Sequence, residues 1–104
     1  MGRTNVYLFK MDSCPHCDAL KELLYKEKIQ FKTIDTDKHK KLFDIVASKT
    51  GMDHVPQILI NEWDGEKFIN SRYVADFETL EEAVDQIKYL KSNPDVTNPK
   101  EKKH

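Results

Sequence analysis

A segment near the start of the chain, NVYLFKMDSCPHCDALKELL, constrains the fold most, because it joins an apolar run directly to a helical pattern. Residues 5–9 form a short, β-rich run of the kind that makes a strand buried on both faces. After a loop over residues 10–13, Cys17, Leu20 and Leu24 follow at spacings of three and four, which predicts a helix with these side chains facing inward. Both cysteines of the chain therefore lie where a strand gives way to a helix.

A second strand, a second helix and a third strand are predicted next along the chain. Residues 29–35 are typical of a strand, and residues 38–50 have a helical period that ends at Gly51, a residue common just past a helix. Residues 56–60 predict the third strand. We expect the buried face of the second helix to be formed by Leu42, Phe43, Ile45 and Val46.

A hairpin and a last helix complete the predicted elements. Asp64 and Gly65 supply a turn into a fourth strand over residues 67–74. The sequence Thr79-Leu80-Glu81-Glu82 has the order of a capping box, which predicts a helix that continues to about Lys91. We expect its apolar face to be formed by Leu80, Ala83, Val84, Ile87 and Leu90.

The predicted order β-α-β-α-β-β-α defines an α/β fold. Right-handed crossovers place strands one and three side by side in a four-stranded mixed sheet, with helices on both faces. This order is the minimal thioredoxin-like architecture. Residues 1–91 are predicted to form one domain, and residues 92–104, with two prolines and no apolar period, a flexible C-terminal tail.

The length and charge of the chain exclude several classes of protein. A chain of 104 residues is expected to form one compact domain. Its formal net charge of -1 provides no excess of positive charge that would bind nucleic acid. The apolar segment near the N-terminus is far shorter than a signal-peptide core or a membrane span. We therefore expect a soluble, cytoplasmic monomer that binds neither nucleic acid nor membranes.

The close spacing of the two cysteines favours redox chemistry over a structural role. A disulfide between Cys14 and Cys17 closes too small a loop to constrain the unfolded chain much. A zinc site needs two further ligands, and the four histidines of the chain are not spaced like a second ligand pair, so no metal is expected.

The residues around Cys14 predict different roles for the two thiols. Pro15 suits the first helical position, which makes Cys14 the N-cap. There its sulfur faces free backbone N–H groups and the positive end of the helix dipole, and His16 adds a nearby donor or charge, so that a thiolate is favoured. Cys17, one turn later on the inward face, is predicted to resolve the mixed disulfide that Cys14 forms.

A proline opposite this junction is the second motif of interest. Val55 and Pro56 precede the third strand, which lies beside the first in the predicted topology. With the C-x-x-C motif beside it, we predict that the Val55–Pro56 bond is cis, which leaves the backbone N–H and C=O of Val55 free to pair with an extended substrate.

The segments YLFKMDSCPHCDALKELL, GMDHVPQILIN and ADFETLEEA together resemble a glutaredoxin. The resemblance implies reduction of protein disulfides, ribonucleotide reductase among them, and of glutathione mixed disulfides, with glutathione as co-substrate and no bound cofactor. It implies Cys14 as nucleophile and Cys17 as resolving thiol. Residues implied in binding glutathione or the substrate are Lys10, Val55, Pro56, Phe77, Glu78 and Thr79, the last three through helix-end N–H groups.

Two features depart from the family pattern. Ala75 and Asp76 stand where the family usually has a glycine pair, and an anionic Asp76 would repel a glutathione carboxylate. The Pro15-His16 dipeptide resembles that of the periplasmic DsbA oxidases rather than the usual Pro-Tyr. Two alternatives therefore stay open: a thioredoxin-like reductase served by a flavoprotein, and a protein in which Cys14 and glutathione from two subunits hold an iron-sulfur cluster.

Overall fold

Seven elements follow one another in the predicted order. The structure, a computed structural model, describes residues 2–94. Its elements are β1 (Gly2–Lys10), α1 (Pro15–Lys26), β2 (Lys32–Asp35), α2 (Lys40–Thr50), β3 (Gln57–Asp64), β4 (Lys67–Val74) and α3 (Leu80–Ser92). The predicted tail over residues 92–104 overlaps the last residue of α3, and its residues 95–104 lie outside the described residues.

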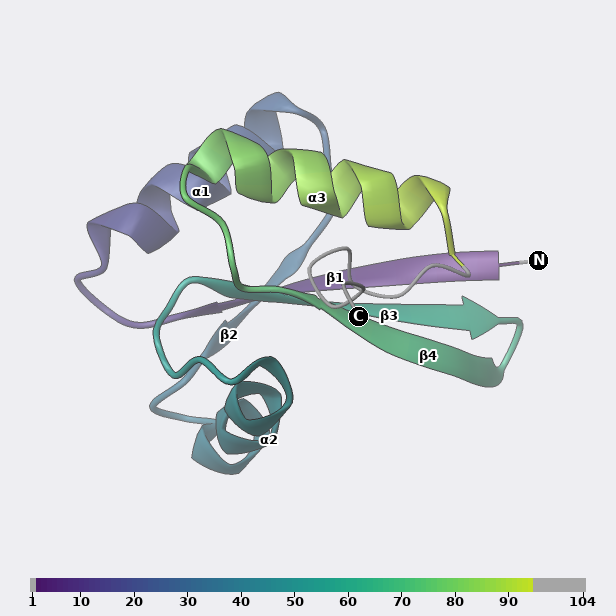
Figure 1. Cartoon of the computed structure of the whole chain (residues 1–104), viewed down its shortest axis with the longest axis horizontal. Helices are drawn as coiled ribbons and strands as arrows, with labels where there is room; N and C mark the ends of the chain where they lie inside the picture. Colours follow the sequence, from purple (N-terminus) through teal and green to yellow (C-terminus); the bar gives the residue numbers. More distant parts are fainter. Residues whose placement is uncertain (1, 95–104) are drawn as a thin grey trace.

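The four strands form one mixed sheet in the order β2-β1-β3-β4 (Figure 1). β1 runs parallel to β2 and antiparallel to β3, which in turn runs antiparallel to β4. Strands one and three are neighbours, as predicted. The predicted α/β fold with a four-stranded mixed sheet is confirmed.

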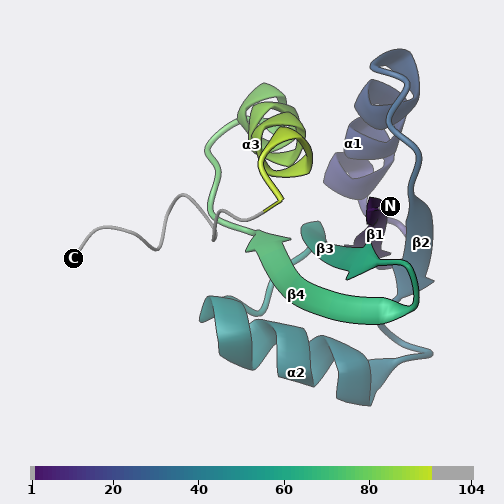
Figure 2. The ribbon, with the colours of Figure 1, turned by 90° about the vertical axis from the view of Figure 1, so that its right-hand side faces the viewer.

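Helices cover both faces of the sheet, with α1 and α3 on one face and α2 on the other (Figure 2). Under α1 and α3 lies the larger apolar cluster, which includes Leu8, Leu20, Ile58 and Ile87. Under α2 lies a smaller cluster in which the Phe9 and Phe43 rings are 5.8 Å apart.

Four loops leave the sheet at the same end, which we call the Cys14 end. The Cα partners Lys10 and Asp35, Phe9 and Gln57, and Ile58 and Val74 place the ends of β1, β2 and β4 beside the start of β3. The loops that follow β1, β2 and β4 and the loop that precedes β3 therefore meet there, on the left of Figure 1.

Strand boundaries differ from the predictions where packing decides them. β2 begins at Lys32 rather than at residue 29, because the preceding residues pack toward the helices. Ile29 is buried in the larger cluster and its N–H donates to the Leu24 carbonyl, while the Phe31 ring lies 5.1 Å from that of Tyr25. β1 and β3 are longer than predicted, because they pair with each other from Gly2 and Asp64 onward.

The predicted buried face of α2 is half wrong. Phe43 and Val46 are buried, but Leu42 and Ile45 are 37% and 55% exposed. α2 is the helix that covers this face of the sheet (Figure 2), and it packs there through its buried residues Phe43 and Val46. The helix also starts at Lys40 rather than at residue 38, because the Lys38 and His39 N–H groups turn back to the Asp35 carbonyl.

A buried ion pair at the opposite end of the sheet holds the hairpin to α3. Arg72, only 2% exposed, donates to the carbonyls of Leu90 and Asn93 at 2.8 and 2.9 Å and to Glu62 at 3.3 Å. The Thr4 hydroxyl donates to the same Glu62 carboxylate at 2.7 Å. Arg72 thus adds a second hydrogen bond to the Leu90 carbonyl, which also accepts the Asn93 N–H, and binds the Asn93 carbonyl just past the end of α3.

None of the helices within residues 2–94 is long and apolar enough to span a membrane.

Candidate active site

Cys14 occupies the N-cap of α1, as its proline neighbour predicts. Its backbone is extended, with φ at -111°, and Pro15 opens the helix. The Cys14 Sγ accepts the N–H of Cys17 at 3.2 Å. The two cysteines form a disulfide with their Cα atoms 5.2 Å apart, so the structure shows the oxidised form of the pair.

The two sulfurs differ in burial. Cys14 is half-buried, whereas Cys17 is fully buried and faces the core between α1 and the sheet. Ser13, with φ at 60°, adopts the left-handed conformation that turns the chain into the helix. Cys14 is therefore the more accessible of the two cysteines, and Cys17 lies behind it.

The Val55–Pro56 loop lies at the Cys14 end, and its peptide bond is cis, as predicted. Pairing of Phe9 with Gln57 places this loop beside the one that carries Cys14. The Val55 side chain packs against the cluster under α2, and within residues 2–94 its backbone makes no hydrogen bond to another backbone group. Its N–H and C=O are therefore available to an extended partner.

A buried glutamine that sequence reasoning missed positions this loop. Gln57 is fully buried, and its amide donates to the carbonyls of Met52 and His54, each at 2.8 Å. Its carbonyl oxygen accepts the Thr50 hydroxyl at 3.0 Å. These bonds fix the loop against the end of α2. The only signal in the sequence was a polar residue inside the apolar run PQILI.

Lys10 lies at the Cys14 end, where its ammonium group has two carboxylates as ion-pair partners. The Lys10 Nζ is 3.7 Å from Asp12 and 3.9 Å from Asp35, its partner on β2. Asp35 is only 15% exposed. The predicted cation is therefore present, with its field partly neutralised before any ligand arrives.

The loop before α3 places the remaining predicted residues at the same end. Phe77 is partly buried against the larger cluster, while Glu78 and Thr79 are exposed. The Thr79 hydroxyl accepts the N–H of Glu82 at 3.1 Å, which is one half of the predicted capping box. The other half differs, because the Glu82 carboxylate accepts the N–H of Glu78 at 2.9 Å rather than that of Thr79.

Two histidines lie near the site and are exposed. His16 follows Pro15 in the first turn of α1. The backbone carbonyl of His54 accepts a hydrogen bond from the Gln57 side-chain amide. Within residues 2–94 no group of His, Cys, Asp or Glu side chains gathers in a way that could hold a metal ion.

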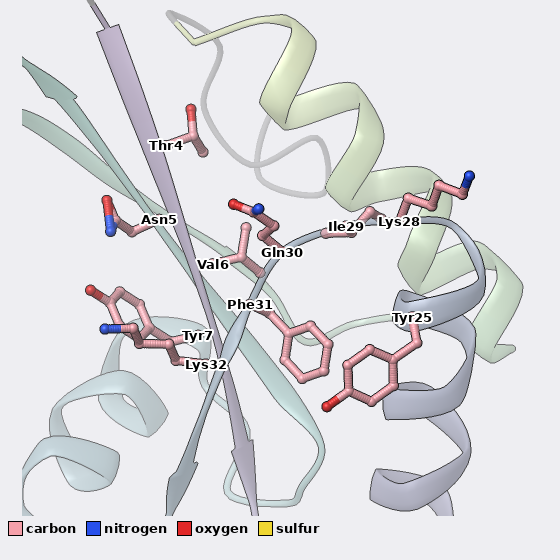
Figure 3. A pocket seen from close by; sticks show the side chains of 10 residues that line it. All are labelled: Thr4, Asn5, Val6, Tyr7, Tyr25, Lys28, Ile29, Gln30, Phe31 and Lys32. Carbon is pink, nitrogen blue, oxygen red and sulfur yellow. The ribbon is translucent and has the colours of Figure 1, made fainter.

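A well-formed pocket lies away from the thiols. It has a volume of about 630 Å³ and opens beside the first half of β1, where β2 does not pair with it. Figure 3 shows the facing rings of Tyr25 and Phe31 at one wall, with Gln30 near the middle. No cysteine lines this pocket. This pocket is therefore separate from the two cysteines.

A C-x-x-C dithiol at the start of α1, beside a cis-proline loop on a four-stranded mixed sheet, makes this chain a thioredoxin-fold thiol-disulfide oxidoreductase. Residues 6–63 match the family model described as glutaredoxin, and the chain belongs to the glutaredoxin family.

Similar proteins agree with this assignment. A relative from Bacillus subtilis strain 168, named N-acetyl-S-hydroxy-L-cysteine reductase, is 31% identical over 64 residues, covering 59% of this chain and 69% of the relative. The glutaredoxin of Brucella melitensis has a TM-score of 0.54 at 18% identity, covering 88% of this chain and 92% of that one. A buckwheat glutaredoxin in complex with glutathione has a TM-score of 0.50 at 19% identity, covering 88% of this chain and 74% of that one.

Proposed function

We propose that this protein reduces protein disulfides and glutathione mixed disulfides through the Cys14/Cys17 dithiol, with glutathione as the electron donor. The observation that carries the proposal is the arrangement of the two sulfurs. The half-buried Cys14 Sγ receives a backbone N–H at the N-terminus of α1, and the buried Cys17 lies directly behind it.

The reaction follows from this arrangement. The Cys14 thiolate attacks a substrate disulfide, forms a mixed disulfide and releases the first substrate sulfur as a thiolate that takes up a proton. Cys17, after losing its proton, attacks the Cys14 sulfur and releases the second substrate thiol. This leaves the Cys14–Cys17 disulfide seen in the structure. Two molecules of glutathione then return the pair to the dithiol and become glutathione disulfide.

Substrate contacts are assigned to the loops at the Cys14 end. The free backbone of Val55, next to Pro56, would pair with an extended substrate segment. Lys10 and the N–H groups near Phe77 and Thr79 would receive glutathione carboxylates. The complex of a buckwheat glutaredoxin with glutathione supports this choice of co-substrate. A cytoplasmic location suits the function, because glutathione keeps thiols reduced there.

A second candidate is the reduction of small sulfenic acids, favoured by the name of the Bacillus subtilis relative. The Cys14 thiolate would attack the sulfur of an S-hydroxy-cysteine, form a mixed disulfide and release hydroxide, which becomes water on protonation. Cys17 would then release the cysteine derivative as a thiol. The same two sulfurs serve both reactions, and only the leaving group differs.

The test is a coupled assay on the wild-type protein. A glutathione mixed disulfide is supplied with NADPH and either glutathione and glutathione reductase or thioredoxin reductase alone, and NADPH consumption is followed. The proposal predicts consumption that depends on glutathione. Consumption only with thioredoxin reductase would contradict it. A third reaction with N-acetyl-S-hydroxy-L-cysteine as substrate measures the second candidate directly.

A further inference from the structure

The first half of β1 has a free edge. β3 pairs with β1 from Gly2 to Phe9, but β2 pairs with it only from Tyr7 to Lys10. Within residues 2–94 the backbone of residues 2–6 makes no hydrogen bond outside the sheet. Alternate residues of a strand direct their N–H and C=O groups to opposite sides, so some of these groups face the side that β2 leaves open. A further strand can pair with them there.

A groove runs along this free edge, because the chain between α1 and β2 turns away from β1. The N–H of Ile29 donates to the Leu24 carbonyl at 2.9 Å, which holds this segment to α1. We call the space the β1 groove, and it is the pocket of about 630 Å³ described above. Its lining residues are Thr4, Asn5, Val6, Tyr7, Tyr25 and residues 28–32. Figure 3 shows the β1 side chains along one side and the Tyr25 and Phe31 rings on the other.

The side chains of the β1 groove combine an aromatic wall with positive charge. Tyr25 is 63% exposed, and its ring lies 5.1 Å from that of Phe31. Lys28 and Lys32 are exposed, and none of the lining residues within residues 2–94 is an aspartate or a glutamate. The groove thus offers a surface for an apolar side chain and cations for an acidic one.

The backbone of Lys28 has a conformation that glycine adopts more easily. Its φ is 59°, in the left-handed region. Within residues 2–94 the other non-glycine residue with a positive φ is Ser13, next to Cys14. Such residues cluster at functional sites, where the strain is offset by a benefit to function. The lysine at position 28 therefore points to a role other than the stability of this turn.

We propose that the β1 groove binds an extended, acidic peptide segment of a partner protein, which adds a strand to the free edge of β1. An apolar side chain of that segment would lie against the Tyr25 and Phe31 rings. Acidic side chains on either side of it would lie beside Lys28 and Lys32. The groove is separate from the two cysteines, so this docking function goes beyond the proposed reaction and does not depend on it.

A second copy of this chain fits the β1 groove less well than an acidic segment. Arg3, which is exposed and lies 5.1 Å above the Trp63 ring, adds a third cation to this edge. Pairing of two β1 edges would bring Arg3, Lys28 and Lys32 of one copy toward the same cations of the other, and like charges across an interface repel.

Fluorescence anisotropy with labelled short peptides tests the proposal on the wild-type protein. The glutamate probe alternates leucine or valine with glutamate, and the lysine probe has lysine at each glutamate position. The glutamate probe should bind saturably, more weakly as salt is raised, and the lysine probe should bind about tenfold more weakly or not at all. Two further glutamate probes carry N-methyl groups on either the odd or the even residues. One of the two should lose binding and the other keep it, because a strand pairs with an edge through alternate residues.

Variants of the two lysines test the charge of the β1 groove. Lys28→Glu and Lys32→Glu should each raise the dissociation constant of the glutamate probe about three- to tenfold at low salt. Lys49→Glu is the matched control, because Lys49 is exposed on α2, which does not line the groove, and the substitution changes the net charge equally. Lys28→Gly should also weaken binding, while its melting temperature rises, since glycine adopts a φ of 59° without strain.

Nuclear magnetic resonance locates the bound probe. Amide shifts on titration with the glutamate probe should be largest at residues 3–6 and 28–32. Equal binding of the glutamate and lysine probes, equal behaviour of the two N-methylated probes, or shifts centred on Cys14 and Val55 would overturn the proposal. So would a lower melting temperature of Lys28→Gly with unchanged binding, or a dimer in sedimentation experiments whose interface is the β1 edge. Failure of glutathione in the coupled assay would contradict the proposed reaction and leave probe binding unchanged.

Discussion

Two helices begin at the Cys14 end of the sheet, and their first turns are used in opposite ways. At α1 the capping atom is the Cys14 sulfur, which accepts the N–H of Cys17 at 3.2 Å. At α3 the capping atom is the Thr79 hydroxyl, and the Glu82 carboxylate takes a further N–H. The N-cap position thus holds a sulfur in one helix and a hydroxyl in the other.

The comparison shows that the identity of the capping atom decides what a helix N-terminus does. A sulfur at this position can lose a proton and gain charge that the dipole stabilises. A hydroxyl in the same place has no such reaction, and a carboxylate beside it repels other anions.

Replacing the sulfur at the start of α1 has the largest expected effect. Cys14→Ser should lose activity toward both protein disulfides and glutathione mixed disulfides, because a serine hydroxyl is not ionised at neutral pH. Cys17→Ser should keep much of the mixed-disulfide activity, which needs one thiol, and lose most dithiol reduction of proteins. Rates with the two substrates measure this, and identical behaviour of the two variants would show that the roles are wrong.

Replacing the cap of α3 should change stability and leave the chemistry intact. Thr79→Ala removes the acceptor for the Glu82 N–H and should lower the free energy of unfolding by about 1 kcal/mol. Urea denaturation measures the change, with Thr79→Ser as the control that keeps a hydroxyl. A large loss in the rate of Cys14 alkylation in Thr79→Ala would mean that the two helix starts do not act independently.

Removing an exposed charge before α3 should have a smaller effect. Asp76→Asn keeps the shape of the side chain, and the Asp76 carbonyl still accepts the Gln86 amide. Less repulsion should lower the Michaelis constant for glutathione by about twofold at low salt, since an exposed charge contributes about 1 kcal/mol or less. A higher Michaelis constant would instead identify Asp76 as a ligand.

The smallest effect is expected at an ion pair that joins α1 to α3. The hydrogen bond from Lys88, and then its positive charge, lower the pKa of Glu27 below its usual 4.5. The same hydrogen bond raises the pKa of Lys88 above its usual 10.5. Because the Glu27 pKa is lowered on folding, its stabilisation is present above pH 4.5 and is lost as the pH falls through the lowered value.

Glu27→Gln should therefore be slightly less stable than the wild type near neutral pH, by less than Thr79→Ala, because both partners are exposed. The difference in melting temperature between the two proteins should close as the pH is lowered below 4.5. A difference that stays constant with pH would mean that the pair is not responsible.

Local chemistry explains which parts of the structure could be predicted. Pro15 fixes the start of α1 and hence the position of Cys14, and the order of elements followed from apolar periodicity; both depend on neighbours in the sequence. The cis bond before Pro56 was predicted from the distant C-x-x-C motif, through the topology that brings the two segments to the same end of the sheet.

The features that were missed depend on distant partners. Gln57 is buried because Thr50 and two loop carbonyls satisfy its amide, which no local pattern shows. Leu42 and Ile45 fit a helical period but face outward, because α2 packs on the sheet through Phe43 and Val46. The Glu82 carboxylate had two possible backbone partners, and the path of the loop before α3 selected Glu78.

Alkylation of the reduced protein at different pH values tests the central claim most directly. The rate of reaction with iodoacetamide is measured for Cys14 in Cys17→Ser and for Cys17 in Cys14→Ser, with mass spectrometry of the wild type as a check. If the start of α1 stabilises a thiolate, Cys14 should react well below neutral pH, where the buried Cys17 hardly reacts. Matching pH profiles for the two thiols would contradict the account.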